Sequence, residues 1–146
     1  MPQPITPPPE DGTRDPLMVL GRIEIPAIEL DRDLQEGIRL ATLDDGPGHW
    51  PGTAMPGQLG NPVIAGHRVS SGAEFRRLDE LVPGDEVIMS TAEGRFVYLV
   101  ESTEIVTPDA LWVVTQTFEH RATLFACHPP GSLRERIVVH LRLAGG

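Results

Sequence analysis

The sequence predicts an all-β fold of seven or eight short strands with only brief helices, closed as a barrel or packed as a sandwich. Aromatic residues make up 5% of the 146 residues, and there are 15 glycines and 15 prolines, which favours short strands and many turns over long helices. Several segments alternate apolar and polar residues, as a strand with one buried face does. Clusters of Gly and Pro separate these segments.

The chain length fits one domain with its own hydrophobic core. Residues 1–16 contain six prolines and are expected to form an extended linker, so the folded domain is expected to cover 17–146. The sequence contains no long apolar run and no signal peptide. Any targeting or anchoring segment of the parent protein is therefore expected to lie outside this sequence.

The first predicted strand covers residues 20–26, where apolar and polar residues alternate. Residues 28–30 are expected to continue this strand beyond Pro26. Residues 34–40 are expected to form a short helix. Residues 44–60 are rich in Gly and Pro and predict a loop.

Residues 62–67 predict a buried strand, and residues 74–82 carry apolar residues at helical spacing. Residues 85–90 and 94–106 predict two strands joined by a turn. Thr107 is expected to cap a further helix, because a proline follows it at the first helical position. Two more strands, described below, complete the chain.

The composition excludes several classes of function. A net charge of −9 argues against nucleic acid and anionic membranes as partners, since both require basic patches. A single cysteine excludes an internal disulfide and a zinc site built from several cysteines. No acidic cluster indicates a calcium site, so we expect no metal and no cofactor.

The single cysteine, Cys127, lies at the end of a predicted strand over residues 122–127. Alternate residues of a strand share a face, so Thr123, Phe125 and Cys127 are expected to point the same way. The prolines at 129 and 130 are expected to end this strand. Cys127 is therefore expected at the lip of a loop, where reactive groups are commonly displayed, and a buried structural thiol is the alternative.

A thiol needs a neighbouring base or cation to act as a nucleophile, and histidine is the usual partner. His67 ends the strand predicted for 62–67 and precedes a turn, so its position matches that of Cys127. Gly66 before it permits close approach by a neighbour or a ligand. His128 is expected on the face opposite Cys127. His120 is expected to be solvated, and His140 in mid-strand is expected to be structural.

Arg136 opens the last predicted strand, 136–143, nine residues after Cys127. A guanidinium there could stabilise a developing oxyanion or bind a substrate carbonyl. Arg134 is the competing candidate, and an ordinary surface arginine is the alternative reading. The residues thus suggest acyl transfer with Cys127 as nucleophile, His67 as acid and base, and Arg136 as charge stabiliser.

Residues 61–68 (N-P-V-I-A-G-H-R) resemble the histidine motif of the sortase family, and residues 123–127 (T-L-F-A-C) resemble its T-L-x-T-C motif. Arg136 stands where that family places its essential arginine. The resemblance extends from about residue 21 to 143. Residues 46–53 and 127–129 are most similar to the class E branch.

This resemblance implies a closed eight-stranded sortase-type β-barrel with one or two short helices. It also implies a cysteine transpeptidase in which Cys127 cleaves the Thr–Gly bond of a C-terminal L-A-x-T-G or L-P-x-T-G sorting signal through a thioacyl intermediate. His67 would protonate the leaving amine and then deprotonate the incoming one. The implied partners are surface proteins or pilins that bear the signal, and an amine from a peptidoglycan precursor or a pilin.

The resemblance further implies an extracytoplasmic monomer that is anchored to the membrane in the full-length protein. Expected substrate-binding residues are Ala126, Ser71, Thr123 and His49. Ala126 replaces the usual Thr before the cysteine, and Ser71 stands where class E members commonly carry Tyr. The preferred signal therefore stays open, and a weak or inactive sortase-like barrel that serves as a binding or pilus-associated module is the alternative.

Two other cysteine enzyme families fit the sequence less well. An L,D-transpeptidase places its cysteine in an S-x-G-C context, which this chain lacks. A papain-like protease places its cysteine before its histidine in the chain, and here the order is reversed.

Overall fold

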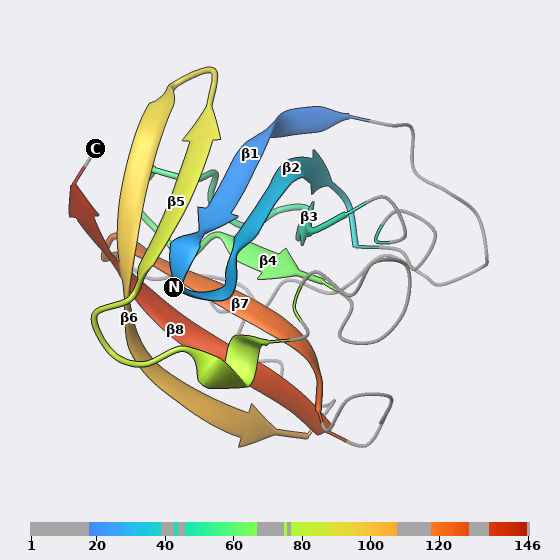
Figure 1. Cartoon of the computed structure of the whole chain (residues 1–146). Coiled ribbons are helices and arrows are strands. Elements are labelled where there is room, and N and C mark those ends of the chain that lie inside the picture. The colour runs from blue at the N-terminus through green and yellow to red at the C-terminus, as the bar shows by residue number, and fades with distance from the viewer. Residues whose placement is uncertain are drawn as a thin grey trace.

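The computed structural model describes residues 18–38, 43, 46–66, 75, 77–107, 118–128 and 135–145. Eight strands form a closed barrel in the order β1-β2-β3-β4-β7-β8-β6-β5 (Figure 1). The strands are β1 (Val19–Ile25), β2 (Leu30–Glu36), β3 (Gly48–His49), β4 (Val63–Ala65), β5 (Glu86–Thr91), β6 (Gly94–Val106), β7 (Arg121–His128) and β8 (Glu135–Gly145). Two short 3-10 helices, η1 (Pro26–Ile28) and η2 (Leu78–Glu80), accompany them in the described part of the chain. The predicted eight-stranded barrel is confirmed.

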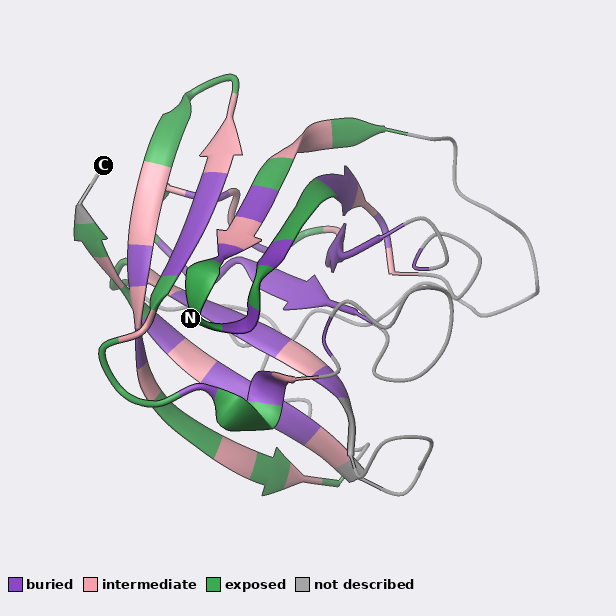
Figure 2. Cartoon of the chain, in the orientation of Figure 1, coloured by how far each residue is buried: buried purple, intermediate pink, exposed green. Residues whose placement is uncertain are grey.

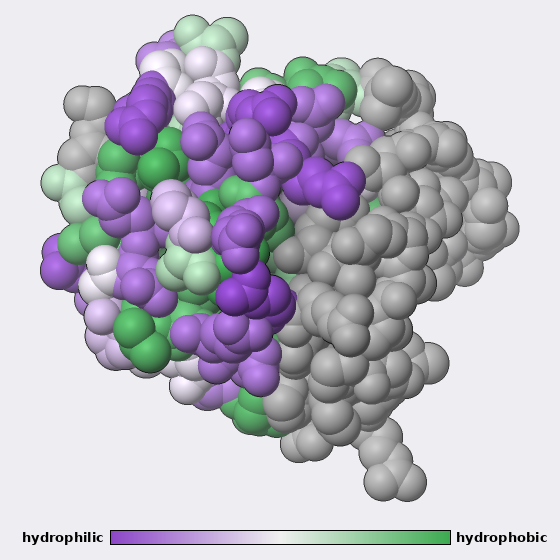
Figure 3. All heavy atoms as spheres, viewed as in Figure 1, coloured by the Kyte–Doolittle hydropathy of each residue, from purple (hydrophilic) through white to green (hydrophobic). Residues whose placement is uncertain are grey.

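Alternation of residue type produces the barrel core. In β1 the side chains of Ile23 and Ile25 are fully buried, whereas Arg22, the residue before Ile23, is exposed. Figure 2 shows the same change from exposed to buried along the strand. Ile23, Ile25 and the inward-facing residues of the other long strands form one continuous apolar cluster. On the face seen in Figure 3, the described surface is mostly hydrophilic with small hydrophobic patches between the polar side chains.

The hairpin predicted for residues 85–106 is confirmed, because β5 pairs antiparallel with β6 and its last residue, Thr91, lies opposite Gly94. The last predicted strand, 136–143, lies within β8. Ile137, Val139 and Leu141 of β8 belong to the core cluster. The chain therefore forms these elements where its sequence pattern is strongest.

The expected continuation of the first strand over residues 28–30 is wrong. Proline at 26 cannot donate a backbone hydrogen bond and begins η1 instead. Glu29 then adopts a left-handed conformation, with φ of 56°, and its N–H donates to the Pro26 carbonyl at 3.1 Å. This turn reverses the chain, so β2 runs antiparallel to β1.

The short helix expected over residues 34–40 is also wrong in its described part. Leu34–Glu36 belongs to β2, because Gln35 and Glu36 pair in parallel with Gly48 and His49 of β3. The partner strand β3 lies inside the segment 44–60 predicted to be a loop. The sequence pattern of either segment alone therefore does not predict this strand pair.

The helix expected over residues 74–82 is reduced to η2 in the described residues. Phe75, Leu78 and Leu81 are buried, as the spacing predicts, but Val82 is 57% exposed. The chain leaves η2 at Leu81 in an extended conformation. Residues 108 and 109 of the helix expected after Thr107 lie outside the described residues.

Strand directions define the two ends of the barrel. Strands β4 and β7 are parallel neighbours, and β8 runs antiparallel to β7. The last residues of β4 and β7 therefore lie at the same end as the first residues of β8. The start of β1 and the turn between β5 and β6 lie at the opposite end, because β1 pairs antiparallel with β5 through Gly21 and Thr91.

Candidate active site

Cys127 is the next-to-last residue of β7, and the predicted strand over residues 122–127 is confirmed with one further residue at each end. In the antiparallel ladder of β7 and β8, Cys127 lies directly opposite Arg136. Arg136 is half-buried and is also paired with Val106 of β6. The structure therefore brings the predicted nucleophile position and the predicted cation to one point of the barrel edge.

The neighbour of β7 on its other side is β4, which leads to His67. Ala65 lies opposite Phe125, and the Gly66 N–H donates to the Phe125 carbonyl at 3.2 Å. Parallel strands end at the same edge of a sheet, so both chain segments leave the barrel together. His67, Ser71 and Arg134 lie outside the described residues.

Gly66, expected to permit a close approach, packs against the ring of Phe75. A Cβ at this position would lie 2.5 Å from one ring carbon of Phe75. Phe75 is fully buried in the core. The backbone just before His67 is therefore held on one side by β7 and on the other by an aromatic ring.

The two faces of β7 contact different parts of the protein. Ala122, Leu124 and Ala126 belong to the barrel core. On the other side Phe125 packs against Trp50, with ring centroids 5.6 Å apart, in a small cluster that includes Val63. This Trp50–Val63–Phe125 cluster lies two residues before Cys127 along β7.

The predicted substrate-binding residues of β7 have contacts within the chain. Thr123 is 2% exposed, and its hydroxyl donates to the Asn61 side-chain oxygen at 2.8 Å. Ala126 is 2% exposed in the core cluster. Thr123 therefore fixes the approach of the preceding loop to β7, and Ala126 fills space inside the barrel.

His49, the remaining predicted substrate contact, is 1% exposed and fully engaged within the chain. Its Nδ1 lies 2.5 Å from the Glu36 carboxylate. Its Nε2 lies 2.8 Å from the Ala54 carbonyl and 3.0 Å from the Thr53 hydroxyl. Sequence reasoning missed Glu36 and Thr53, although Thr53 follows His49 by four residues in the Gly- and Pro-rich segment.

Glu36, His49 and Thr53 show the carboxylate–imidazole–hydroxyl order of a nucleophilic triad, but their hydrogen bonds exclude that function. The Ala54 carbonyl can only accept, so Nε2 of His49 must carry a hydrogen and cannot take a proton from Thr53. The Thr53 hydroxyl hydrogen is already donated to the Trp50 carbonyl at 2.8 Å. Thr53 is also buried, which closes it to a substrate.

His120 and His140 lie away from Cys127. His120 is exposed in the segment before β7. His140 in the middle of β8 pairs with Glu104 of β6 at 2.5 Å. Within the described residues, no group of three His, Cys, Asp or Glu side chains is placed to hold a metal ion.

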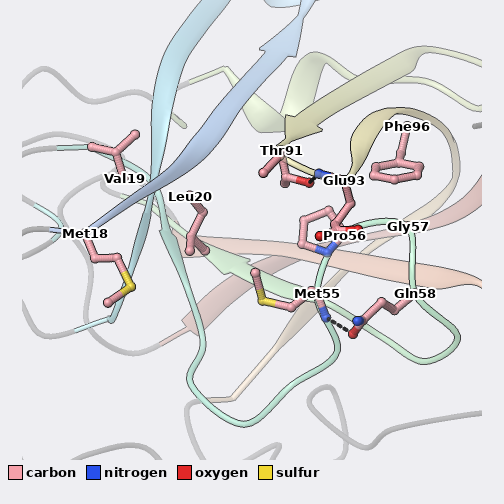
Figure 4. Close-up of a pocket in the computed structure, with 11 residues that line it drawn as sticks. Met18, Val19, Leu20, Met55, Pro56, Gly57, Gln58, Thr91, Glu93 and Phe96 are labelled. Atoms are coloured by element: carbon pink, nitrogen blue, oxygen red, sulfur yellow. Dashed lines mark hydrogen bonds between the residues drawn. The ribbon is translucent and has the colours of Figure 1, made fainter.

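A cavity of about 660 Å³ opens at the barrel end opposite Cys127 (Figure 4). Its walls are the start of β1, the turn between β5 and β6, and residues 55–58. Met18, Met55 and Phe96 supply apolar surface, and Glu93 supplies the carboxylate. None of the predicted site residues that the structure describes lines this cavity.

The closed barrel, with its thiol position opposite an arginine at the edge where two parallel strands end, defines a sortase-type barrel domain. Residues 23–144 match the sortase domain, and the chain belongs to the sortase family.

Several relatives support this assignment. The chain is 31% identical over 124 residues to Sortase D of Bacillus subtilis, covering 82% of this chain and 61% of that protein. It is 30% identical over 144 residues to Sortase SrtE1 of Streptomyces coelicolor, covering 88% and 41%. Among solved structures, a Sortase D5 transpeptidase from Clostridium perfringens superposes with a TM-score of 0.79 at 32% identity, covering 87% and 79%. Sortase A from Corynebacterium diphtheriae superposes with a TM-score of 0.83 at 25% identity, covering 93% and 75%.

The chain spans 61% of the length of Sortase D of Bacillus subtilis, 41% of Sortase SrtE1 and 64% of Sortase A of Bacillus anthracis. The identities to Sortase D and to Sortase SrtE1 differ by one percentage point, so the class E assignment stays a prediction. In the part of the chain that the structure describes, no helix has the length and hydropathy needed to span a bilayer.

Proposed function

We propose that this chain is the catalytic domain of a cysteine transpeptidase that cleaves the Thr–Gly bond of an L-A-x-T-G or L-P-x-T-G sorting signal and joins the protein to an amine. One observation carries the proposal: Cys127 lies opposite Arg136 at the barrel edge where β4 and β7 both end. Gly66, the residue before His67 in the sequence, is hydrogen-bonded to β7 at that edge. Membership of the sortase family supports the same reaction.

The ladder geometry supports Arg136 as the group that stabilises negative charge. Residues directly opposite each other in an antiparallel pair have Cβ atoms about 4.5–5.5 Å apart on the same side of the sheet. A guanidinium at this position can donate two hydrogen bonds to an oxyanion without losing its own proton. Arg136 would therefore bind the carbonyl oxygen of the scissile Thr residue as charge develops on it.

The parallel pairing of β4 and β7 supports His67 as acid and base. The register advances residue by residue from Val63 opposite Thr123 to Ala65 opposite Phe125. Continued by two residues, this register would pair position 67 with position 127. An imidazole beside a thiol can exchange a proton with it.

The proposed reaction proceeds in two transfers. The Cys127 thiolate attacks the Thr carbonyl carbon, the C–N bond to Gly breaks, and the His67 imidazolium gives its proton to the leaving amine. The incoming amine then attacks the thioester, loses a proton to the His67 imidazole, and releases the thiolate. The amine would come from a peptidoglycan precursor or a pilin, and the full-length protein would act outside the cytoplasm, anchored to the membrane.

The test is to incubate the chain with L-A-x-T-G and L-P-x-T-G peptides and a glycine or diaminopimelate-like amine. Mass spectrometry then detects a thioacyl adduct and the joined product, and the adduct is assigned without ambiguity because Cys127 is the only cysteine. We expect Cys127→Ala to abolish both species and Arg136→Lys to lower the rate far more than the matched Arg134→Lys. The absence of an adduct with either peptide would contradict the proposal.

The buried Ala126 favours the second candidate, a weak or inactive sortase-like barrel that serves as a binding module. That candidate lacks an activated thiolate. It predicts that iodoacetamide alkylates Cys127 no faster than it alkylates a free cysteine peptide at the same pH, whereas the transpeptidase predicts faster alkylation.

A further inference from the structure

Both ring nitrogens of His49 have hydrogen-bond partners within the chain. Nε2 lies against the Ala54 carbonyl, which has no hydrogen to give. Nδ1 lies 2.5 Å from the Glu36 carboxylate, which when ionised can also only accept. His49 therefore links the end of β2 to residues 53–54 through its two ring nitrogens.

The Thr53 hydroxyl connects His49 and Glu36 to the backbone of Trp50. It donates to the Trp50 carbonyl at 2.8 Å and accepts from the Val63 N–H at 3.3 Å. His49 Nε2 approaches the same oxygen at 3.0 Å. The Thr53 N–H donates to the Trp50 carbonyl at 3.2 Å, and the Trp50 N–H donates to the Val63 carbonyl at 2.8 Å. We refer to Glu36, His49 and Thr53 as the clasp.

The Trp50 backbone is hydrogen-bonded to the clasp, whereas its ring lies in an apolar cluster. Its indole Nε1 is buried and has no hydrogen-bond partner among the described residues. Within the described residues the ring is thus held by apolar packing and by the position of its backbone. The ring packs on Phe125 and Val63, which belong to the two strands that end at the proposed active site.

We propose that His49 is a positioning residue for the transpeptidase reaction. Through Thr53 it holds Trp50 against Phe125, and this contact keeps the end of β7 in register beside β4. The inference rests on the proposed function for its effect on rate, but its structural part is independent of any activity. His49 touches no substrate in this proposal, because it is buried.

Two pairs of variants separate the bonds of the clasp. Glutamine at position 49 can place a donor near the position of Nε2, and asparagine can place one near the position of Nδ1. We expect His49→Asn and Thr53→Val to lower kcat about 10- to 100-fold with less than about threefold change in KM, since small displacements near a reacting group have effects of this size. We expect His49→Gln and Thr53→Ser to stay within about fivefold of the wild type.

The matched control is His140→Asn, which removes the other His–Glu pair of the described chain at the same 2.5 Å separation. The side chains of His140 and Glu104 are 23% and 41% exposed, compared with 2% and 31% for His49 and Glu36. We expect this control to change kcat less than twofold.

A second readout reports the clasp without turnover. The chain has two tryptophans, so a Trp112→Phe background leaves Trp50 as the single fluorophore. We expect His49→Asn and Thr53→Val to increase acrylamide quenching of Trp50 at least twofold in protein that urea titration shows to be folded. His49→Gln and Thr53→Ser supply the comparison if an asparagine or valine variant does not fold.

The outcomes are distinct. If quenching and kcat of His49→Asn match those of His140→Asn, the inference is overturned. If the folded clasp variants lose activity with unchanged Trp50 quenching, the route through Trp50 is overturned. If wild-type protein forms no thioacyl adduct, the proposed function fails. The quenching of Trp50 and the alkylation rate of Cys127 then still decide whether the clasp positions Trp50 and the end of β7.

Discussion

Gly66→Ala tests the close contact that fixes the backbone before His67. A Cβ there would lie 2.5, 2.8 and 2.9 Å from three ring carbons of Phe75, compared with an ordinary carbon–carbon contact of about 3.5–4.0 Å. The ring must therefore move by about 1 Å. Phe75 is fully buried, so no solvent space receives it, and overpacking of this kind costs about 1–3 kcal/mol.

Urea unfolding followed by circular dichroism measures this cost, since the midpoint and slope give the free energy of unfolding. We expect Phe75→Leu to recover part of the loss in the Gly66→Ala background, with a coupling energy of about 0.5–3 kcal/mol. Gly84→Ala is the control: no atom lies within 4 Å of its Cβ, but its φ of +96° makes alanine strained, so Phe75→Leu should not rescue it. Additive effects of Gly66→Ala and Phe75→Leu, or a Gly66→Ala loss below about 0.5 kcal/mol, would refute the reasoning.

Four further predictions concern other parts of the barrel. Gly21→Ala should cost at least about 3 kcal/mol by urea titration, because its Cβ would lie 1.8 Å from a backbone oxygen of β5 that cannot rotate away. Tyr98→Phe should cost about 1–2 kcal/mol, since the buried hydroxyl accepts the Gly57 N–H at 2.8 Å. Burial raises the pKa of Tyr98, the single tyrosine, above 10.0, and the hydrogen bond from Gly57 opposes this shift in part. The folded chain therefore keeps the phenol proton to higher pH than the unfolded chain, so the free energy of unfolding should fall as the pH rises above about 10. A titration followed by phenolate absorbance should show the raised midpoint. The double variant Ala126→Cys with Cys127→Ala moves the thiol by one residue to a position that is 2% exposed. Iodoacetamide should alkylate this thiol at least tenfold more slowly in the folded protein than in urea. Equal alkylation rates in the folded protein and in urea would contradict this.

The sequence predicts the elements whose pattern is local. The hairpin of β5 and β6, the strand that ends near Cys127, and the inward face of β8 all follow from alternation and turn residues. The motifs at residues 61–68 and 123–127 predict membership of the sortase family and, through it, the closed barrel. These features are predictable because neighbouring residues in the chain determine them.

The elements that the sequence does not reveal depend on distant partners. Strand β2 carries exposed charges at Asp31, Arg32 and Asp33, so its apolar pattern is weak. Its end is stabilised by the two-residue strand β3, which lies in a Gly- and Pro-rich segment that reads as loop. The pairing of β2 with β3 brings Glu36 next to His49. The alternation of apolar and polar residues along the chain therefore does not predict the clasp.

The topology explains why the proposed site draws its groups from separate segments. Strands β4 and β7 are neighbours in space although β5 and β6 lie between them in sequence, and their parallel direction brings both carboxyl ends to one edge. Strand β8 then returns antiparallel, which places its first residues at that same edge. Two strand ends and one strand start thus coincide, and the proposed site takes Cys127 and Arg136 from this edge and His67 from the residue after Gly66. The contacts of Trp50 with Phe125 and of Gly66 with Phe75 lie on the two strands β7 and β4, so in the proposed reaction the packing beneath this edge would set how closely the thiol and the imidazole meet.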